Sequence, residues 1–132
     1  MEIKYINQPP SILNQFIAEI RDQHIQTDPL RFRRNLERIG EIFAYEISKT
    51  LSYEEKDVQT PLGVAKEFLP QEKLVIASIL RAGIPLHNGL LNYFDRCENA
   101  FVSAFRKYNE DGHFEINIEY ISGPDLNGKT LI

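Results

Sequence analysis

The sequence predicts an α/β fold in which a mainly parallel sheet is flanked by helices. One observation is the apolar run from Leu74 to Leu80, which is typical of a strand buried on both faces. Another is that this run passes through Arg81-Ala82-Gly83 into a helical segment without a linker. The third is residues 28–47, whose apolar positions recur at helical spacing. A buried strand that turns directly into a helix is the pattern of a parallel sheet covered by helices.

Two helices are predicted before the first core strand. Residues 1–10 form an arm that ends in two consecutive prolines, which disfavour regular structure. Helical spacing of apolar residues then predicts a short helix over residues 11–21. A longer helix begins where Asp28 can cap it and Pro29 can fill its first position. Its apolar stripe comprises Phe32, Leu36, Ile39, Phe43 and Ile47.

The polar residues of the longer helix leave two interpretations open. A solvated face stabilised by pairs such as Arg33–Glu37 is the simpler one. A dimer surface is the alternative, because a long arginine-rich helix can pair across a two-fold axis. The charged residues concerned are Arg31, Arg33, Arg34, Glu37, Arg38, Glu41 and Glu46.

The segment before the apolar run is predicted to contain little strand. Residues 51–60 are charged and indicate a loop with one short edge segment, Lys56 to Gln59. Pro61 can then open a helix over residues 62–68, which Pro70 ends. The acidic cluster is interpreted as solvated side chains of the loop: Glu54, Glu55 and Asp57.

The turn after Leu80 is the first candidate site. Gly83 allows backbone torsions that are closed to other residues, and Pro85 suits the first turn of a helix that extends to Tyr93. In open α/β sheets ligands bind at the carboxyl ends of strands. Arg81 can offer a fork of donors to phosphate oxygens there, and backbone N–H groups can add an anion nest. The residues alone also allow the plainer interpretation of a surface arginine on an ordinary turn.

A second predicted strand carries a second arginine. Residues 99–105 form this strand and Arg106 lies at its end. Two arginines, Arg81 and Arg106, that follow successive strands predict a phosphate or pyrophosphate site at one edge of the sheet. A turn at Asn109 to Gly112 leads into a half-exposed strand over residues 113–122, which we expect to be antiparallel to its neighbour. Its apolar face comprises Phe114, Ile116, Ile118 and Tyr120.

The last residues resemble the start of another buried strand. A turn at Pro124 to Gly128 precedes this strand, which occupies residues 129–132. A core strand that stops at its start leaves a sheet unfinished, and natural domain boundaries usually fall in polar linkers. We therefore expect residues 1–132 to be a single domain that is the N-terminal part of a larger one. The arm and helices would occupy residues 1–70, and the start of the core sheet residues 71–132.

Composition narrows the class of protein. The 132 residues are 42% hydrophobic and 26% charged, with a net charge of -4, so no basic excess favours nucleic acid or an anionic membrane as a partner. The single cysteine, Cys97, excludes an internal disulfide and fits a reducing compartment. No signal peptide is visible, and no stretch approaches the roughly 18 apolar residues of a membrane helix. We expect a cytoplasmic protein.

Several familiar kinds of site are missing from the sequence. The histidines, His24, His87 and His113, show no metal-ligand spacing and are interpreted as surface or turn residues. The sequence contains no nucleophile elbow, no Walker loop and no dinucleotide-binding glycine motif. No metal ligand and no catalytic residue is therefore predicted.

The run from Ile79 to Pro85 resembles the turn of uracil phosphoribosyltransferases. Three further segments agree in order and spacing, so that the resemblance covers nearly the whole chain: residues 32–47, residues 58–62 and Phe105-Arg106. Matched position by position, Arg81, Ala82 and Gly83 correspond to the pyrophosphate-binding turn. Arg106 corresponds to a second pyrophosphate contact. The resemblance also implies a strained or cis peptide in the turn.

The resemblance implies a type I phosphoribosyltransferase fold with a hood that recognises the base. It implies pyrimidine salvage, in which ribose 5-phosphate passes from phosphoribosyl pyrophosphate (PRPP) to N1 of uracil and gives UMP and pyrophosphate. It further implies Mg2+ bound through the pyrophosphate of the substrate and a homodimer or higher homo-oligomer. Activation by GTP is left open.

One departure from the family is large. The acidic residue and Ala-Thr-Gly-type loop of the phosphoribosyl signature do not occur, and by spacing they would begin just after Ile132. The uracil-binding segment is also absent, so we expect the chain alone to be inactive. Two alternatives follow. One is a non-catalytic degenerate paralogue that acts as a dimerisation or regulatory binding module. The other is a phosphoribosyltransferase for a different base.

Overall fold

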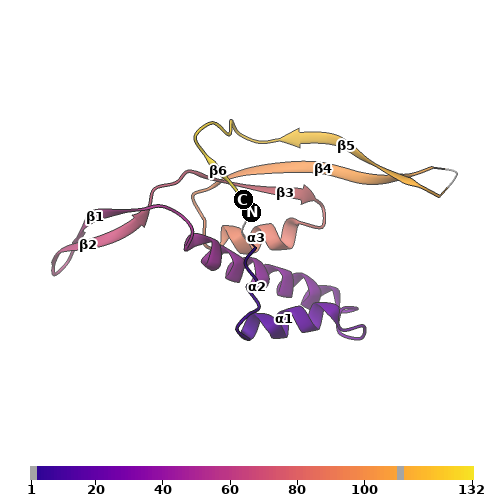
Figure 1. Ribbon diagram of the computed structural model, residues 1–132, viewed down its shortest axis with the longest axis horizontal. Coiled ribbons are helices and arrows are strands. Elements are labelled where there is room, and N and C mark those ends of the chain that lie inside the picture. The colour runs from indigo at the N-terminus through magenta and orange to yellow at the C-terminus, as the bar shows by residue number, and fades with distance from the viewer. Residues whose placement is uncertain (1–2, 110–111) are drawn as a thin grey trace.

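The computed structural model describes residues 3–109 and 112–132, and it confirms the α/β fold. Its helices lie one below another on one face of a four-stranded sheet, with α3 next to the sheet and α1 farthest from it (Figure 1). In chain order the elements are α1 (Ile12–Arg21), α2 (Pro29–Ser48), β1 (Tyr53–Thr60), β2 (Gly63–Pro70), β3 (Leu74–Leu80), α3 (Ile84–Leu91), β4 (Glu98–Tyr108), β5 (Phe114–Ser122) and β6 (Thr130–Leu131).

The sheet has the order β5-β4-β3-β6 and is mainly parallel. β3 pairs in parallel with β4 on one side, where Leu80 lies opposite Ser103, and with β6 on the other, where Val75 lies opposite Leu131. The predicted strand at the last residues is thus confirmed. It is tied to β3 further by the Ile132 carbonyl, which accepts from the Ala77 N–H at 2.8 Å.

Both predicted N-terminal helices form, and capping explains where they begin. The Ser11 side chain accepts from the Leu13 N–H and forms a capping box with Asn14. The Asp28 side chain accepts from two N–H groups of the first turn of α2, and Pro29 fills its first position. Each cap satisfies donors that a helix start leaves without a partner.

The core lies between α2, α3 and β3. Ala44, Ile76 and Leu90 form its buried cluster. Of the predicted stripe on α2 only Ile39 is fully buried, and the other buried residues of this helix are Asn35, Gly40 and Ala44. Small residues occupy the inner face because α2 and α3 approach closely: a Cβ on Gly40 would lie 2.4 Å from the Leu86 carbonyl oxygen.

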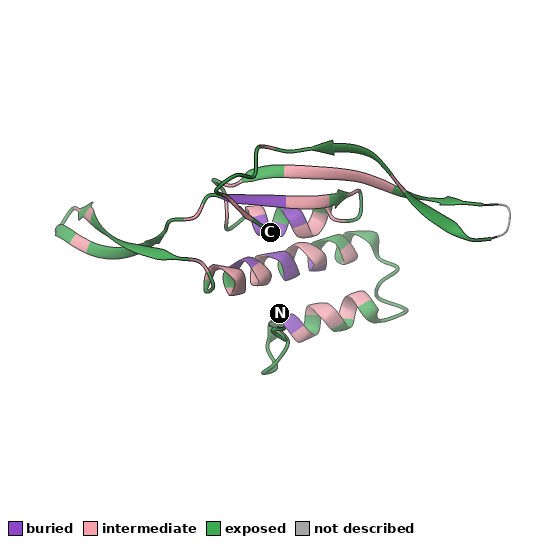
Figure 2. Cartoon of the chain, turned by 45° about the horizontal axis from the view of Figure 1, so that its top comes forward, coloured by how far each residue is buried: buried purple, intermediate pink, exposed green. Residues whose placement is uncertain are grey.

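The prediction for residues 51–68 is wrong except for the short edge segment from Lys56 to Gln59, which lies within β1. Instead of a loop and a helix, β1 and β2 form an antiparallel hairpin in which Tyr53 pairs with Pro70 and Thr60 with Gly63. The hairpin projects from the body of the molecule (Figure 1), and nearly all of its residues are exposed on both faces (Figure 2). Since neither face is buried, no alternation of apolar residues marks these strands. The acidic cluster is exposed as predicted, but it lies on β1.

The β4–β5 hairpin confirms the predicted antiparallel pairing, but β5 is exposed on both faces and not half-exposed. β4 continues to Tyr108, because β5 supplies a partner beyond the end of β3. A bulge at Ser103 and Ala104 pairs Tyr120 with Ser103 and Ile121 with Val102, so Ile121 replaces Tyr120 on the predicted apolar face. Of the predicted turn, residues 110–111 lie outside the described residues.

The sheet is covered unevenly. β3 is buried from Leu74 to Ile76, but Ile79 is 62% exposed. Burial of this strand on both faces is therefore confirmed only for its first half, since the helices of the described residues all lie on one side (Figure 2). None of the described helices is long and apolar enough to cross a membrane.

Candidate functional site

The turn between β3 and α3 forms as predicted. The chain passes from Leu80 through Arg81, Ala82 and Gly83 directly into α3, and Pro85 lies in the first turn of this helix. The Gly83 N–H donates to the Ile79 carbonyl at 3.1 Å, and the Ile84 N–H donates to the Arg81 carbonyl at 3.2 Å. The Leu80–Arg81 peptide bond is cis, as the resemblance implies. α3 ends at Leu91, two residues before the predicted end.

Gly83 is needed for space and not for its torsions. Its φ of -71° and ψ of -15° are ordinary helical values, so the expectation of a special backbone conformation is wrong. A Cβ at this position would lie 2.9 Å from the Ile79 carbonyl oxygen and 3.3 Å from Ser78 Cβ. Any larger residue would push the turn away from β3.

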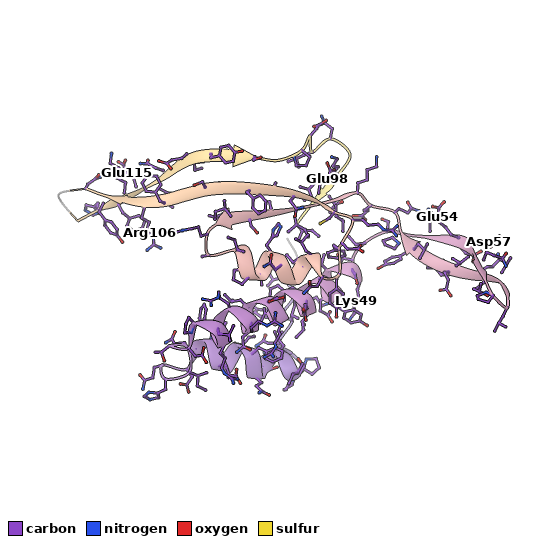
Figure 3. All side chains as sticks on the ribbon, turned by 180° about the vertical axis from the view of Figure 1, so that it is seen from behind. Lys49, Glu54, Asp57, Glu98, Arg106 and Glu115 are labelled. Atoms are coloured by element: carbon purple, nitrogen blue, oxygen red, sulfur yellow. The ribbon has the colours of Figure 1, made fainter. Side chains whose placement is uncertain are left out.

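Arg81 and Arg106 lie at the same end of the sheet but are not equivalent. Arg81 directly follows β3, whereas Arg106 lies within β4, opposite Ile116 of β5 (Figure 3). The expectation that Arg106 ends its strand is therefore wrong. Leu80 pairs with Ser103, so Arg106 is three positions beyond the end of β3, roughly 10 Å further along β4.

Both arginines are exposed and differ in their contacts. The Arg106 guanidinium lies 4.9 Å from the centre of the Phe114 ring, a cation–π contact that holds it over β5. Among the described residues, the N–H groups of Arg81 and Ala82 make no backbone hydrogen bond. The turn therefore offers a guanidinium and two backbone donors at the carboxyl edge of the sheet, a combination suited to an anion.

The interpretation of His87 as a surface or turn residue is wrong. His87 lies on α3, is only 3% exposed, and bonds through both ring nitrogens. Nδ1 is 2.9 Å from Ser78 Oγ of β3, and Nε2 is 2.7 Å from Asn99 Oδ1 of β4. A lone histidine has no spacing signal, but Ser78 interrupts an apolar strand and could have indicated a buried polar partner.

The arginine-rich face of α2 is used within the chain. Arg34, and not Arg33, pairs with Glu37 at 2.6 Å. Arg31 bridges to Glu19 of α1 at 3.2 Å, and Asn35 Nδ2 donates to the same carboxylate at 2.6 Å. The hydrogen bond from Asn35, followed by those from Gln15 and Arg31, lowers the pKa of Glu19 below its ordinary value.

A cavity lies at the opposite end of β3 from the arginine turn. It has a volume of about 820 Å³, and its lining includes Leu74, Tyr93, Cys97 and Glu98. Burial raises the pKa of the Cys97 thiol. Nearby, hydrogen bonds from the Thr130 hydroxyl and the Ser52 N–H lower the pKa of Glu72, whose carboxylate joins β6 to the start of β1.

Comparison with known proteins shows to which family the chain belongs. The family model for uracil phosphoribosyltransferase matches residues 8–118. The chain belongs to the uracil phosphoribosyltransferase family. The predicted resemblance is thereby confirmed, and with it the type I phosphoribosyltransferase-like character of the fold.

The chain matches only part of the length of each relative. The uracil phosphoribosyltransferase of Porphyromonas gingivalis is 56% identical over 132 residues, which are 100% of this chain and 61% of the relative. That of Methanothermobacter thermautotrophicus is 36% identical over 123 residues, 92% of this chain and 55% of the relative. Among solved structures, the AQ2163 protein from Aquifex aeolicus superposes with a TM-score of 0.77 at 28% identity, covering 99% of this chain and 59% of that one. The chain thus spans about three fifths of these relatives.

Proposed function

We propose that the complete protein is a uracil phosphoribosyltransferase acting in pyrimidine salvage, and that this chain supplies its pyrophosphate-binding part. The reaction would transfer ribose 5-phosphate from PRPP to N1 of uracil and give UMP and pyrophosphate. The observation that supports the proposal best is the turn of Arg81 and Ala82 at the carboxyl end of β3, in a chain of the uracil phosphoribosyltransferase family.

The turn residues have distinct roles in this proposal. The Arg81 guanidinium and the Ala82 N–H donate to pyrophosphate oxygens. The Gly83 N–H is already bonded to Ile79, so Gly83 contributes by letting the turn lie close to β3. Arg106 supplies a second cation from the neighbouring strand. These assignments remain predictions from the family's pattern.

Leaving-group stabilisation is the chemistry that such residues provide. As the bond between C1 of the ribose and pyrophosphate breaks, C1 gains oxocarbenium character and negative charge builds on the pyrophosphate. Cations and N–H donors fixed at that position stabilise the transition state more than the ground state. The protein then needs to supply little covalent chemistry of its own.

Magnesium enters this proposal as part of the substrate. Phosphate oxygens are hard ligands that Mg2+ prefers, and in the part of the chain that is described no group of three or more His, Cys, Asp or Glu could hold a metal ion. When bound, Mg2+ would neutralise charge on the pyrophosphate. The predicted homodimer or larger oligomer, the activation by GTP and the cytoplasmic location remain predictions.

The test is formation of UMP from uracil, PRPP and Mg2+. It compares the product of the complete reading frame with residues 1–132 alone, and repeats the assay with adenine, guanine, hypoxanthine and orotate. We expect UMP from the complete product with uracil as the preferred base, and no turnover by residues 1–132. Preference for another base would replace uracil as the substrate. A folded complete product that uses no base would contradict the enzyme proposal and favour a non-catalytic binding module.

A further inference from the structure

A polar network centred on the buried His87 lies between α3 and the sheet, next to the arginine turn. His87 is bonded to Ser78 of β3 and Asn99 of β4, at 2.9 and 2.7 Å, and its ring centre lies 5.0 Å from that of Phe101. Since Asn99 Oδ1 can only accept, His87 Nε2 carries the hydrogen and Nδ1 accepts from the Ser78 hydroxyl. One side chain of α3 thus joins both parallel strands.

The network reaches the turn by two routes. The backbone N–H of His87 donates to the Gly83 carbonyl at 2.9 Å. The His87 side chain is also bonded to Ser78, and a Cβ added to Gly83 would lie 3.3 Å from the Ser78 Cβ. His87 further lines a cavity of about 240 Å³ together with Leu80, which immediately precedes the turn.

Filling the core does not require a histidine at this position. An apolar side chain of similar volume would pack between α3 and the sheet without the cost of burying the polar imidazole of His87. In the described residues no buried polar side-chain atom lacks a partner, so the network is fully satisfied. The two ring nitrogens of the buried His87 keep their partners only in this arrangement of α3 against β3 and β4, because another arrangement would leave a buried ring nitrogen unbonded.

We propose that His87 is a positioning residue that fixes the Arg81–Gly83 turn for pyrophosphate. This inference rests on the proposed function of the turn. The link to Ser78 carries the effect because it holds β3 next to Gly83, whereas the link to Asn99 anchors α3 to β4. His87 touches no substrate in this account and acts through the turn alone.

Two substitutions separate the two links. His87→Asn places a polar atom at the position of Nδ1 and retains the bond to Ser78, whereas His87→Gln places one at the position of Nε2 and retains the bond to Asn99. We expect His87→Gln to raise the KM for PRPP by about tenfold, a change that the loss of one buried hydrogen bond can produce. The KM for uracil should stay within about twofold, whereas kcat should fall together with the affinity for PRPP, because the turn stabilises the leaving pyrophosphate more in the transition state than in the ground state. His87→Asn should keep a KM for PRPP near that of the wild type.

The readouts distinguish this inference from the proposed function. Kinetics are measured on the product of the complete reading frame, and binding of magnesium pyrophosphate is measured by calorimetry. Ser78→Ala is a smaller change that removes the same hydrogen bond, and it should raise the KM for PRPP as His87→Gln does. It serves as the test if His87→Gln does not fold. If the KM for PRPP is the same in His87→Gln, His87→Asn and Ser78→Ala, the inference is overturned and the enzyme proposal stands. Pyrophosphate binding that weakens in His87→Gln without any UMP formation would support the inference and contradict the enzyme. A wild type that does not bind pyrophosphate would overturn both.

Discussion

At the scale of single residues, Arg81 is the clearest test of the site, because its exposed side chain is not needed for the core. Arg81→Ala removes a charged donor and should raise the KM for PRPP at least tenfold, since hydrogen bonds between charged groups are worth about 1.5–3 kcal/mol. The KM for uracil and the thermal midpoint should not change. Steady-state kinetics of the complete product measure this, with Arg33→Ala, an exposed arginine of α2, as the matched control. An unchanged rate at low PRPP would remove Arg81 from the site.

Cys97 provides a second prediction at the same scale. Because burial raises the pKa of its thiol, Cys97 is protonated at neutral pH and should alkylate more slowly with iodoacetamide than free cysteine. The rate should still be rising with pH beyond the ordinary thiol value of about 8.5, where the rate of free cysteine levels off. Mass spectrometry over a series of pH values follows the reaction. Labelling at pH 7 as fast as that of free cysteine would show that Cys97 is not buried as described.

At the scale of elements, the packing of α2 against α3 depends on two glycines. A Cβ on Gly89 would lie 2.0 Å from the Glu37 carbonyl oxygen, so Gly89→Ala must separate the helices. Alanine favours a helix over glycine by about 1 kcal/mol, but the cost of overpacking should exceed this gain. We expect a net destabilisation of about 2–3 kcal/mol. Urea unfolding measures the change, with Asn88→Ala on the exposed side of α3 as control. A Gly89→Ala variant as stable as the wild type would contradict the close approach.

The contact of α1 with α2 should be sensitive to acid. The pKa of Glu19 is lower in the folded chain than in the unfolded one, so its carboxylate stabilises the fold above the unfolded value of about pH 4.3. This contribution is lost as the pH falls through the folded value. Glu19→Gln should therefore be less stable than the wild type at pH 7, with the difference vanishing in acid. Unfolding by urea at several pH values tests this against Glu115→Gln, an exposed carboxylate of β5 (Figure 3). A difference that does not depend on pH would exclude an ionic contribution.

How well an element could be predicted depended on its burial. β3 is predictable because its buried first half is an apolar run, and α1 and α2 because their caps and apolar spacing agree. The β1–β2 hairpin was missed because its exposed faces impose no pattern. Pro61 is compatible with a helix start, but it lies in the two-residue loop between Thr60 and Gly63.

At the scale of the whole molecule, the site could be predicted only in part. The position of Arg81 follows from the order of strand, turn and helix, and its proposed role follows from the family's pattern. The buried setting of His87 could not be predicted, because Ser78 and Asn99 meet it only after β3, β4 and α3 have packed. The position of Arg106 within β4 could not be predicted either, since the length of β4 is set by its pairing with β5.

The central claim, that the Arg81–Gly83 turn binds pyrophosphate, is tested most directly by a crystal structure of the complete protein with magnesium pyrophosphate. We predict pyrophosphate oxygens within hydrogen-bond distance of the Arg81 guanidinium and the Ala82 N–H, at the carboxyl end of β3. Pyrophosphate bound elsewhere, or an empty turn at a concentration that saturates binding in solution, would contradict the account.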